Sequence, residues 1–252
     1  MTVQTQVPAE EAARALVRSQ IYRALALAFR HPEADGVRAL AEMAPALAAS
    51  AVGRVPDPVR EALSDLRAAL DGATLESLQE QYVATFGHVT VPDCPLYETA
   101  CGMGDPFLQP QTLADLAGFY RAFGLEMAGE ARERADHLTV ELEFMHYLAY
   151  REAYALEHHG PEQTAAIHDA QRGFLEAHLG RWAPVLARAV SARADGALGA
   201  AARLLERLLA HEVKHWGILP APVVAEGAPL MIPPLDDYDP AEEDDDFTGR
   251  EP

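Results

Sequence analysis

Residues 136–158 read DHLTVELEFMHYLAYREAYALEH, and this stretch decides what kind of fold the chain can adopt. Apolar side chains recur in it at helical spacing along two separate stripes. A helix with two apolar stripes has to be buried on most of its sides, so we expect it at the centre of an all-helical domain. The stripes are formed by Leu138, Leu142, Met145 and Ala149 and by Val140, Phe144, Tyr147 and Leu148.

Helical patterns also account for most of the chain on both sides of this stretch. Alanine is abundant and β-branched residues are scarce, which favours helices over strands. Thr74 is a suitable N-cap, and Gly87 and Gly124 are placed where helices should end. We therefore predict an all-α fold, a single globular helical bundle over residues 1–235. The expected helices span residues 8–30, 35–50, 58–70, 74–87, 112–124, 136–158, 161–179, 182–192 and 197–216.

Three segments interrupt these patterns. Residues 88–110 are rich in proline and glycine, and a loop of this length within a compact domain is usually functional or disordered. Residues 126–135 are charged and contain a glycine, so they are the candidate hinge between an N-terminal part, residues 8–125, and a C-terminal part, residues 136–216. After Gly217, repeated prolines forbid regular structure.

The composition excludes some classes of partner. Of the 252 residues, 49% are hydrophobic, and 39 acidic side chains face 20 basic ones, giving a net charge of −19. Nucleic acid is not an expected partner, because phosphate binding needs a basic surface. Residues 236–252 carry nine acidic side chains and one arginine. We expect a disordered, solubilising tail there, with attraction of a basic peptide as the alternative.

The N-terminus and the cysteines indicate the compartment. Residues 1–5 have neither the basic nor the apolar region of a signal peptide, and no apolar run approaches the roughly 18 residues of a membrane span. We therefore expect a cytoplasmic protein without a membrane span. Its two cysteines, Cys94 and Cys101, lie in one loop, where reduced thiols are expected and a local disulfide or metal site is the alternative.

Two metal-like patterns need an explanation. Residues 211–215, HEVKH, place two histidines one helical turn apart, as in zinc proteases, but no third ligand follows. Both histidines continue the stripe of Leu204 and Leu208, so packing is the favoured role. The alternative function is a helical-bundle metalloenzyme built on two Glu-x-x-His pairs. Those pairs are Glu143 with His146 and Glu212 with His215. Such pairs also arise by chance, so we expect no metal, no cofactor and no catalytic residue.

A pair of short segments, residues 93–99 (DCPLYET) and residues 134–138 (RADHL), carries the functional hypothesis. Asp136 ordinarily would cap the following helix, but its carboxylate is also a good acceptor for an arginine guanidinium. Glu98 is hard to bury without a partner. Together they offer apolar surface and charge, which suits an amphipathic peptide helix that carries arginines.

These segments resemble motifs of the TorD-like chaperones, the group of TorD, DmsD and NarJ, which mature molybdenum enzymes. That family has an aromatic-x-x-Leu-Phe helix end, a Pro-aromatic-Glu-Ser loop and a Glu-x-Pro-Asp-His motif. Residues 82–86, 95–99 and 133–137 correspond to them here. The sequence departs from the family pattern at Thr85, Cys101 and Ala135, where leucine, tyrosine and proline are usual.

Residues 107–125, FLQPQTLADLAGFYRAFGL, look most like the branch that serves the type II dimethyl-sulfoxide-reductase group. The resemblance implies a non-enzymatic chaperone, acting as a monomer or a swapped dimer. It would bind the twin-arginine leader and the apo catalytic subunit of a molybdoenzyme and hold that subunit until its cofactor is inserted. The leader-binding residues that the resemblance implies are Tyr82, Phe86, Pro95, Leu96, Tyr97, Glu98, Asp136 and His137.

Overall fold

The computed structural model describes residues 6–87, 94–101, 109–127, 133–221 and 223. Within these ranges the chain forms α-helices, one short 3₁₀ turn and no strand, which confirms the all-α prediction. None of the described helices combines the length and the apolar character that crossing a membrane requires. The acidic segment 236–252 lies outside the described ranges. The elements are α1 (Gln6–Phe29), α2 (Ala34–Ser50), α3 (Asp57–Leu70), α4 (Leu75–Phe86), η1 (Glu98–Ala100), α5 (Gln109–Ala122), α6 (Leu138–His158), α7 (Pro161–Ala177), α8 (Leu179–Ser191) and α9 (Gly196–Trp216).

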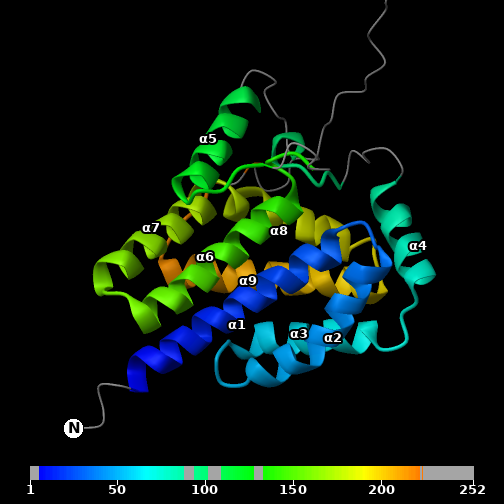
Figure 1. Ribbon diagram of the computed structural model, residues 1–252. Helices are drawn as coiled ribbons and strands as arrows, with labels where there is room; N and C mark the ends of the chain where they lie inside the picture. Colours follow the sequence, from blue (N-terminus) through cyan, green and yellow to red (C-terminus); the bar gives the residue numbers. More distant parts are fainter. Residues whose placement is uncertain (1–5, 88–93, 102–108, 128–132, 222, 224–252) are drawn as a thin grey trace, which may run out of the picture.

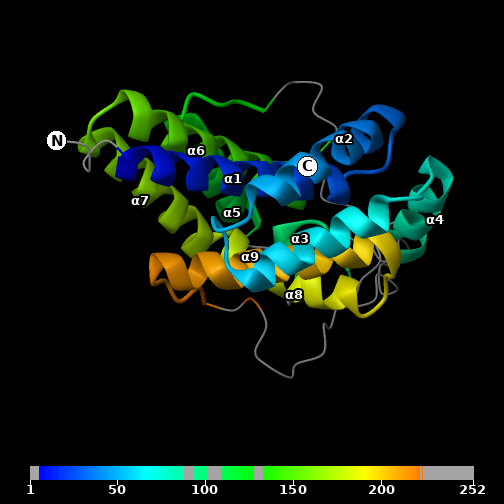
Figure 2. The same cartoon turned by 90° about the horizontal axis from the view of Figure 1, so that it is seen from below.

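Helix α1 crosses the middle of the molecule and packs against α6 and α9 (Figures 1 and 2). Helices α2 and α3 fold back beside it, and α3 lies along α9. Helices α7 and α8 follow α6 and close the other side of the bundle. Helix α4 stands at the edge of the molecule, where its last turn faces the loop that precedes η1.

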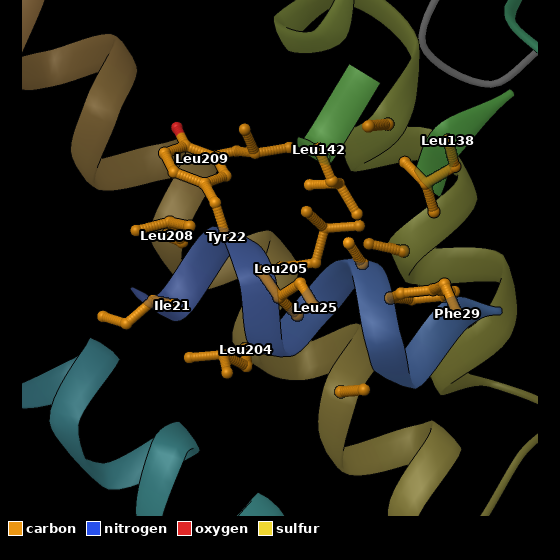
Figure 3. Packing of buried hydrophobic residues seen from close by; sticks show 14 of the residues in the cluster. Ile21, Tyr22, Leu25, Phe29, Leu138, Leu142, Leu204, Leu205, Leu208 and Leu209 are labelled. Atoms are coloured by element: carbon orange, nitrogen blue, oxygen red, sulfur yellow. The ribbon is translucent and has the colours of Figure 1, made fainter. Parts of the chain in front are cut away.

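The hydrophobic core forms where α1, α6 and α9 meet (Figure 3). Because α1 belongs to the predicted N-terminal part and the other two helices to the C-terminal part, both parts contribute to one core. The middle of the hinge predicted for residues 126–135, residues 128–132, lies outside the described residues, and the hinge stays a prediction. The side chains labelled in Figure 3 are Ile21, Tyr22, Leu25, Phe29, Leu138, Leu142, Leu204, Leu205, Leu208 and Leu209.

A buried ionic network lies beside this core. Arg18 of α1 donates from Nε and Nη2 to the two carboxylate oxygens of Glu212, at 2.8 and 2.7 Å. Its Nη1 atom donates to Glu152 Oε2 at 2.9 Å, and its Nη2 atom also donates to Gln171 Oε1 at 2.8 Å. All four side chains are buried. We call this set the Arg18 network; it joins α1, α6, α7 and α9.

The charges of the Arg18 network are fixed by their mutual contacts. Burial alone would raise the pKa of Glu152, but hydrogen bonds from His168 and Gln171 and the charge of Arg18 lower it to about 2. Burial would likewise lower the pKa of Arg18, yet Glu212 and Glu152 hold it above its ordinary value. Arg18 and Glu152 therefore stay ionised in the folded chain at neutral pH.

Most predicted helix boundaries agree with the structure to within a residue or two. Thr74 caps α4 and exchanges two hydrogen bonds with Ser77, and Gly87 follows the helix with a φ of 71°. Helix α5 starts at Gln109, not at residue 112, because the proline after Gln109 fits the first turn of a helix. Helix α8 starts three residues earlier than predicted, directly after His178.

The two histidines of α9 do not continue its buried face. That face runs through Leu205, Leu208 and Leu209 to Glu212, which is fully buried. His211 is half-buried and His215 is exposed, with the two rings 5.8 Å apart. The prediction that the histidines close a packed stripe was therefore wrong, because the buried face of α9 ends at Glu212 and not at the histidines.

Candidate functional site

The two segments that carried the functional hypothesis lie side by side. Leu138 donates its backbone N–H to the carbonyl of Leu96 at 2.8 Å, and Glu98 donates its N–H to the carbonyl of Asp136 at 2.9 Å. Tyr97 and His137 face each other as an isolated antiparallel bridge. This pairing fixes the loop of residues 94–101 to the start of α6.

A groove opens between this paired loop and α4. It has a volume of about 340 Å³ and is mainly apolar and aromatic, with one acid, Glu133, at its rim. We call it the α4 groove. It is lined by His31, Tyr82, Val83, Phe86, Gly87, Cys94, Leu96, Tyr97, Glu133 and His137.

Aromatic contacts hold the two walls of the α4 groove. The rings of Tyr82 and Phe86 lie 4.8 Å apart on α4, and the rings of Tyr97 and His137 lie 4.9 Å apart on the opposite wall. Phe86 is buried, whereas Tyr82 and Tyr97 are partly exposed. Tyrosines in this setting offer an apolar ring with a polar end, which suits recognition of a peptide.

Five of the eight predicted binding residues line this groove: Tyr82, Phe86, Leu96, Tyr97 and His137. His137 also caps α6, since its Nδ1 atom accepts the N–H of Thr139 at 3.2 Å. Burial lowers the pKa of His137, although Glu133 and Asp136 oppose this effect. The imidazole is therefore neutral at pH 7, and it offers the groove a polar but uncharged wall.

Asp136 is fully buried and is not the cap of α6, which corrects one predicted role. Its carboxylate accepts hydrogen bonds from Arg134 Nε at 3.0 Å and Nη2 at 2.7 Å, and from Thr99 Oγ1 at 2.6 Å. Burial would raise the pKa of Asp136, but the bonds from Arg134 and Thr99 lower it. The acceptor that we predicted for a client arginine is already occupied by an arginine of the same chain.

Glu98 and Pro95 are also buried, and neither lines the α4 groove. The Glu98 carboxylate accepts from His178 Nδ1 at 3.0 Å, so η1 is tied to the junction of α7 and α8. The other imidazole nitrogen of His178 lies 3.2 Å from Asp115. The prediction that Glu98 presents its charge on the loop surface was therefore wrong. Glu98 is buried, and its hydrogen bond with His178 offsets the cost of removing its carboxylate from water.

Glu133 is the acid that lines the α4 groove, where the prediction had placed Asp136 and Glu98. Its side chain is 40% exposed, and its Oε2 atom accepts a hydrogen bond from the Tyr97 hydroxyl at 2.9 Å. Arg134 beside it lies over the Tyr97 ring, 4.9 Å from the centroid. The sequence did contain a signal, because Glu133 stands four residues before His137, in the motif already singled out.

The structure disperses the four residues of the alternative metalloenzyme. Glu212 belongs to the Arg18 network, and Glu143 forms an ion pair with Arg30. His146 contacts Ser19, and His215 packs against Trp216. Among the described residues, no three histidine, cysteine or acidic side chains are grouped so that they could hold a metal ion. Cys94 and Cys101 are buried reduced thiols.

Helix α6 also carries a buried acid to which the sequence analysis gave no role. Glu141 of α6 accepts a hydrogen bond from Trp182 Nε1 at 3.1 Å, and its Oε1 atom has no hydrogen-bond partner among the described residues. Burial, and then the charge of Glu98, raise the pKa of Glu141 well above its ordinary value of 4.5. The folded chain therefore holds a proton here that the unfolded chain releases.

The free energy of unfolding of Glu141→Gln, minus that of the wild type, should rise by about 1 kcal/mol between pH 5 and pH 6. A carboxyl group whose pKa is raised by folding stabilises the folded chain fully at a pH below its pKa in the unfolded chain. This stabilisation is lost as the pH rises toward the pKa in the folded chain, by up to about 1.4 kcal/mol per pH unit. Urea unfolding at both pH values measures this difference, with Glu61→Gln at an exposed position of α3 as the control. Identical pH slopes for wild type and Glu141→Gln would contradict a raised pKa.

Comparison with known proteins gives one family. Residues 53–188 match the family model described as nitrate reductase delta subunit. The chain is 31% identical over 201 residues to the perchlorate reductase assembly chaperone protein of Dechloromonas aromatica (strain RCB), covering 76% of this chain and 86% of that protein. It is 34% identical over 124 residues to the selenate reductase assembly chaperone protein of Thauera selenatis (47% and 60% covered). It is 30% identical over 168 residues to the chlorate reductase assembly chaperone protein of Ideonella dechloratans (65% and 71% covered).

Proposed function

The chain belongs to the nitrate reductase delta subunit family, and from this membership we propose that it is a cytoplasmic assembly chaperone for the catalytic subunit of a molybdenum-containing reductase. The names of its relatives support the coarse assignment, and the TorD-like motifs at residues 82–86, 95–99 and 133–137 agree with it. In this proposal the chain catalyses no reaction. It binds the twin-arginine leader and the apo catalytic subunit until the cofactor has been inserted.

The α4 groove is the observation that carries the leader-binding part of the proposal. It joins an aromatic wall on α4 to a loop that is fixed by backbone hydrogen bonds, with Glu133 at its rim. A pre-formed groove of this kind spares the cost of ordering a loop when the peptide binds. Its chemistry suits an amphipathic helical segment, whose apolar face enters the groove while a basic residue reaches the rim.

The leader's arginine has one charged acceptor to meet at that rim, the carboxylate of Glu133. The Glu133 carboxylate offers a charged acceptor, and the Tyr97 ring beside it already carries the guanidinium of Arg134. Guanidinium groups pair well with carboxylates and stack on aromatic rings. The acidic surface of the chain, with its net charge of −19, adds a long-range attraction for a basic leader.

Glu133→Gln should weaken leader binding about five-fold. The partly exposed carboxylate forms a charge-assisted pair with the arginine, and such a pair contributes about 1 kcal/mol when water still reaches it. The measurement is a calorimetric titration with the synthetic twin-arginine leader of the client. The matched control is Glu162→Gln, which removes one exposed acid from the first turn of α7.

Equal leader affinities for Glu133→Gln and Glu162→Gln would show that the lost charge acts only from a distance, and the rim contact would then be wrong. The client itself is identified by capturing partners from the cytosol with the purified chain. If the captured catalytic subunit binds equally well after its leader is removed, the leader-binding half of the proposal fails. The assembly half does not.

A further inference from the structure

A second pocket lies next to the α4 groove and is not part of it. It is bounded by α1, α2, α3, α4 and α9, and its volume is about 160 Å³. We call it the leucine pocket, because most of its wall is aliphatic. Among the residues that form it are Leu27, Leu40, Leu66, Leu70, Leu78 and Leu198.

The size of the leucine pocket limits what can enter it. An apolar cavity of about 150 Å³ is large enough for one benzene molecule and stays dry when empty. The pocket therefore accommodates one aromatic or branched aliphatic side chain. Its mouth reaches the surface beside Arg30 and Asp35, whose side chains are 51% and 88% exposed.

The leucine pocket and the α4 groove adjoin each other. His31 and Tyr82 line both, with their rings in edge contact at 5.2 Å. Gln79 of α4 donates to the carbonyl of Pro32 at 3.0 Å, which holds this shared wall in place. A peptide that lies in the groove against His31 and Tyr82 is therefore one residue layer away from the pocket.

We propose that the leucine pocket is the anchor site for a single bulky apolar side chain of the same client segment whose arginine meets Glu133. This inference rests on the proposed function and adds the chemistry of the ligand. The client segment carries an aromatic or branched aliphatic residue at a fixed distance from its basic residue. Recognition then depends on this spacing as well as on charge.

Gly36→Leu tests the pocket with little risk to the fold. Gly36 lies in the first turn of α2 on the wall of the pocket, and a Cβ atom added there meets nothing within 4 Å. Leucine also favours a helix more than glycine does. The matched control is Gly118→Leu in α5, where an added Cβ likewise meets nothing within 4 Å, outside the pocket. Circular dichroism verifies that both variants are folded.

Toluene is the first probe, because it fills the pocket without any contribution from the groove. Titration should shift the methyl resonances of Leu40 and Leu66 in the wild type and in Gly118→Leu, and should leave them unchanged in Gly36→Leu. Unshifted resonances in the wild type would overturn the proposal, since they would mean that the pocket does not admit an apolar group.

A peptide series is the second probe. The host peptide contains an arginine pair among alanine and glutamine residues, and one phenylalanine is moved through successive positions. At one spacing the phenylalanine should tighten binding to the wild type about ten-fold or more, because a buried aromatic side chain is removed from water. Gly36→Leu should abolish this gain, and Gly118→Leu should retain it.

The outcomes separate this inference from the proposed function. If the host peptides bind but the phenylalanine gives no gain, or the gain persists in Gly36→Leu, the anchor site alone is wrong. If no peptide of the series binds the wild type, the leader-binding function fails and the anchor site fails with it. A dimer that Gly36→Leu abolishes, without a phenylalanine-dependent gain, would mean that the pocket receives a second copy of this chain, and would overturn the proposal.

Discussion

Replacing Arg18 by methionine is expected to lower the free energy of unfolding by about 3 to 5 kcal/mol. The substitution leaves the carboxylates of Glu152 and Glu212 buried and without the guanidinium that both contact. Breaking a buried ion pair from one side costs about this much, because the remaining charge has lost its solvent and its partner. Urea unfolding followed by circular dichroism measures the loss.

Two further variants define what Arg18 contributes. Arg14→Met changes an exposed arginine on the same helix and should alter stability by less than about 0.5 kcal/mol. Replacing Arg18, Glu152 and Glu212 together by methionine should recover much of the loss, because no unpaired charge then remains. If the triple variant is as unstable as Arg18→Met, Arg18 stabilises the chain through the packing around it and not through its charge.

Asp136→Asn is expected to destabilise the chain by about 2 kcal/mol. The carboxylate accepts bonds from Arg134 and Thr99 in a buried site, and bonds to a charged group contribute about 1.5 to 3 kcal/mol. The affinity for the leader should fall only to the extent that loss of these bonds makes the wall of the α4 groove less rigid. Denaturant unfolding and titration with the client's leader are measured on the same samples, with Asp65→Asn at an exposed position of α3 as the control.

The opposite pattern would restore the role that the sequence indicated for Asp136. If Asp136→Asn weakens leader binding ten-fold or more while its unfolding free energy stays at the wild-type value, the carboxylate receives the client's arginine itself. Arg134 would then have to leave Asp136 when the client binds. This result would contradict the structural role that the buried contacts support.

The sequence was sufficient for the helices because their signals are local. Apolar spacing, the cap at Thr74 and the glycine after α4 depend on residues within a few positions of one another. The same information located the loop of residues 94–101 and the start of α6, although not their backbone pairing. Of the eight site residues that the family resemblance implied, five line the groove.

The errors arose where the partner is distant in the chain. Arg18 and Glu212 are separated by 194 positions, and nothing local indicates that Glu212, and not its neighbouring histidines, faces the core. Glu98 is buried because His178, 80 positions away, donates to it. Asp136 was misassigned for a different reason. Its partner Arg134 is two residues away, but the sequence of a loop does not indicate which of its side chains point into the protein.

The helices that supply the Arg18 network also determine how two copies of the chain can exchange parts. Arg18 comes from the N-terminal part, whereas its acidic partners come from the C-terminal part. A swapped dimer that trades residues 8–125 between copies inserts each Arg18 between the acids of the other copy and rebuilds the same bonds. The two assemblies are then nearly equal in energy and differ mainly in the connecting residues 126–135. Converting one into the other, however, requires withdrawing a buried guanidinium from two carboxylates in each copy. For a chain that forms both assemblies we expect slow exchange, so that monomer and dimer fractions from one preparation remain distinct after separation.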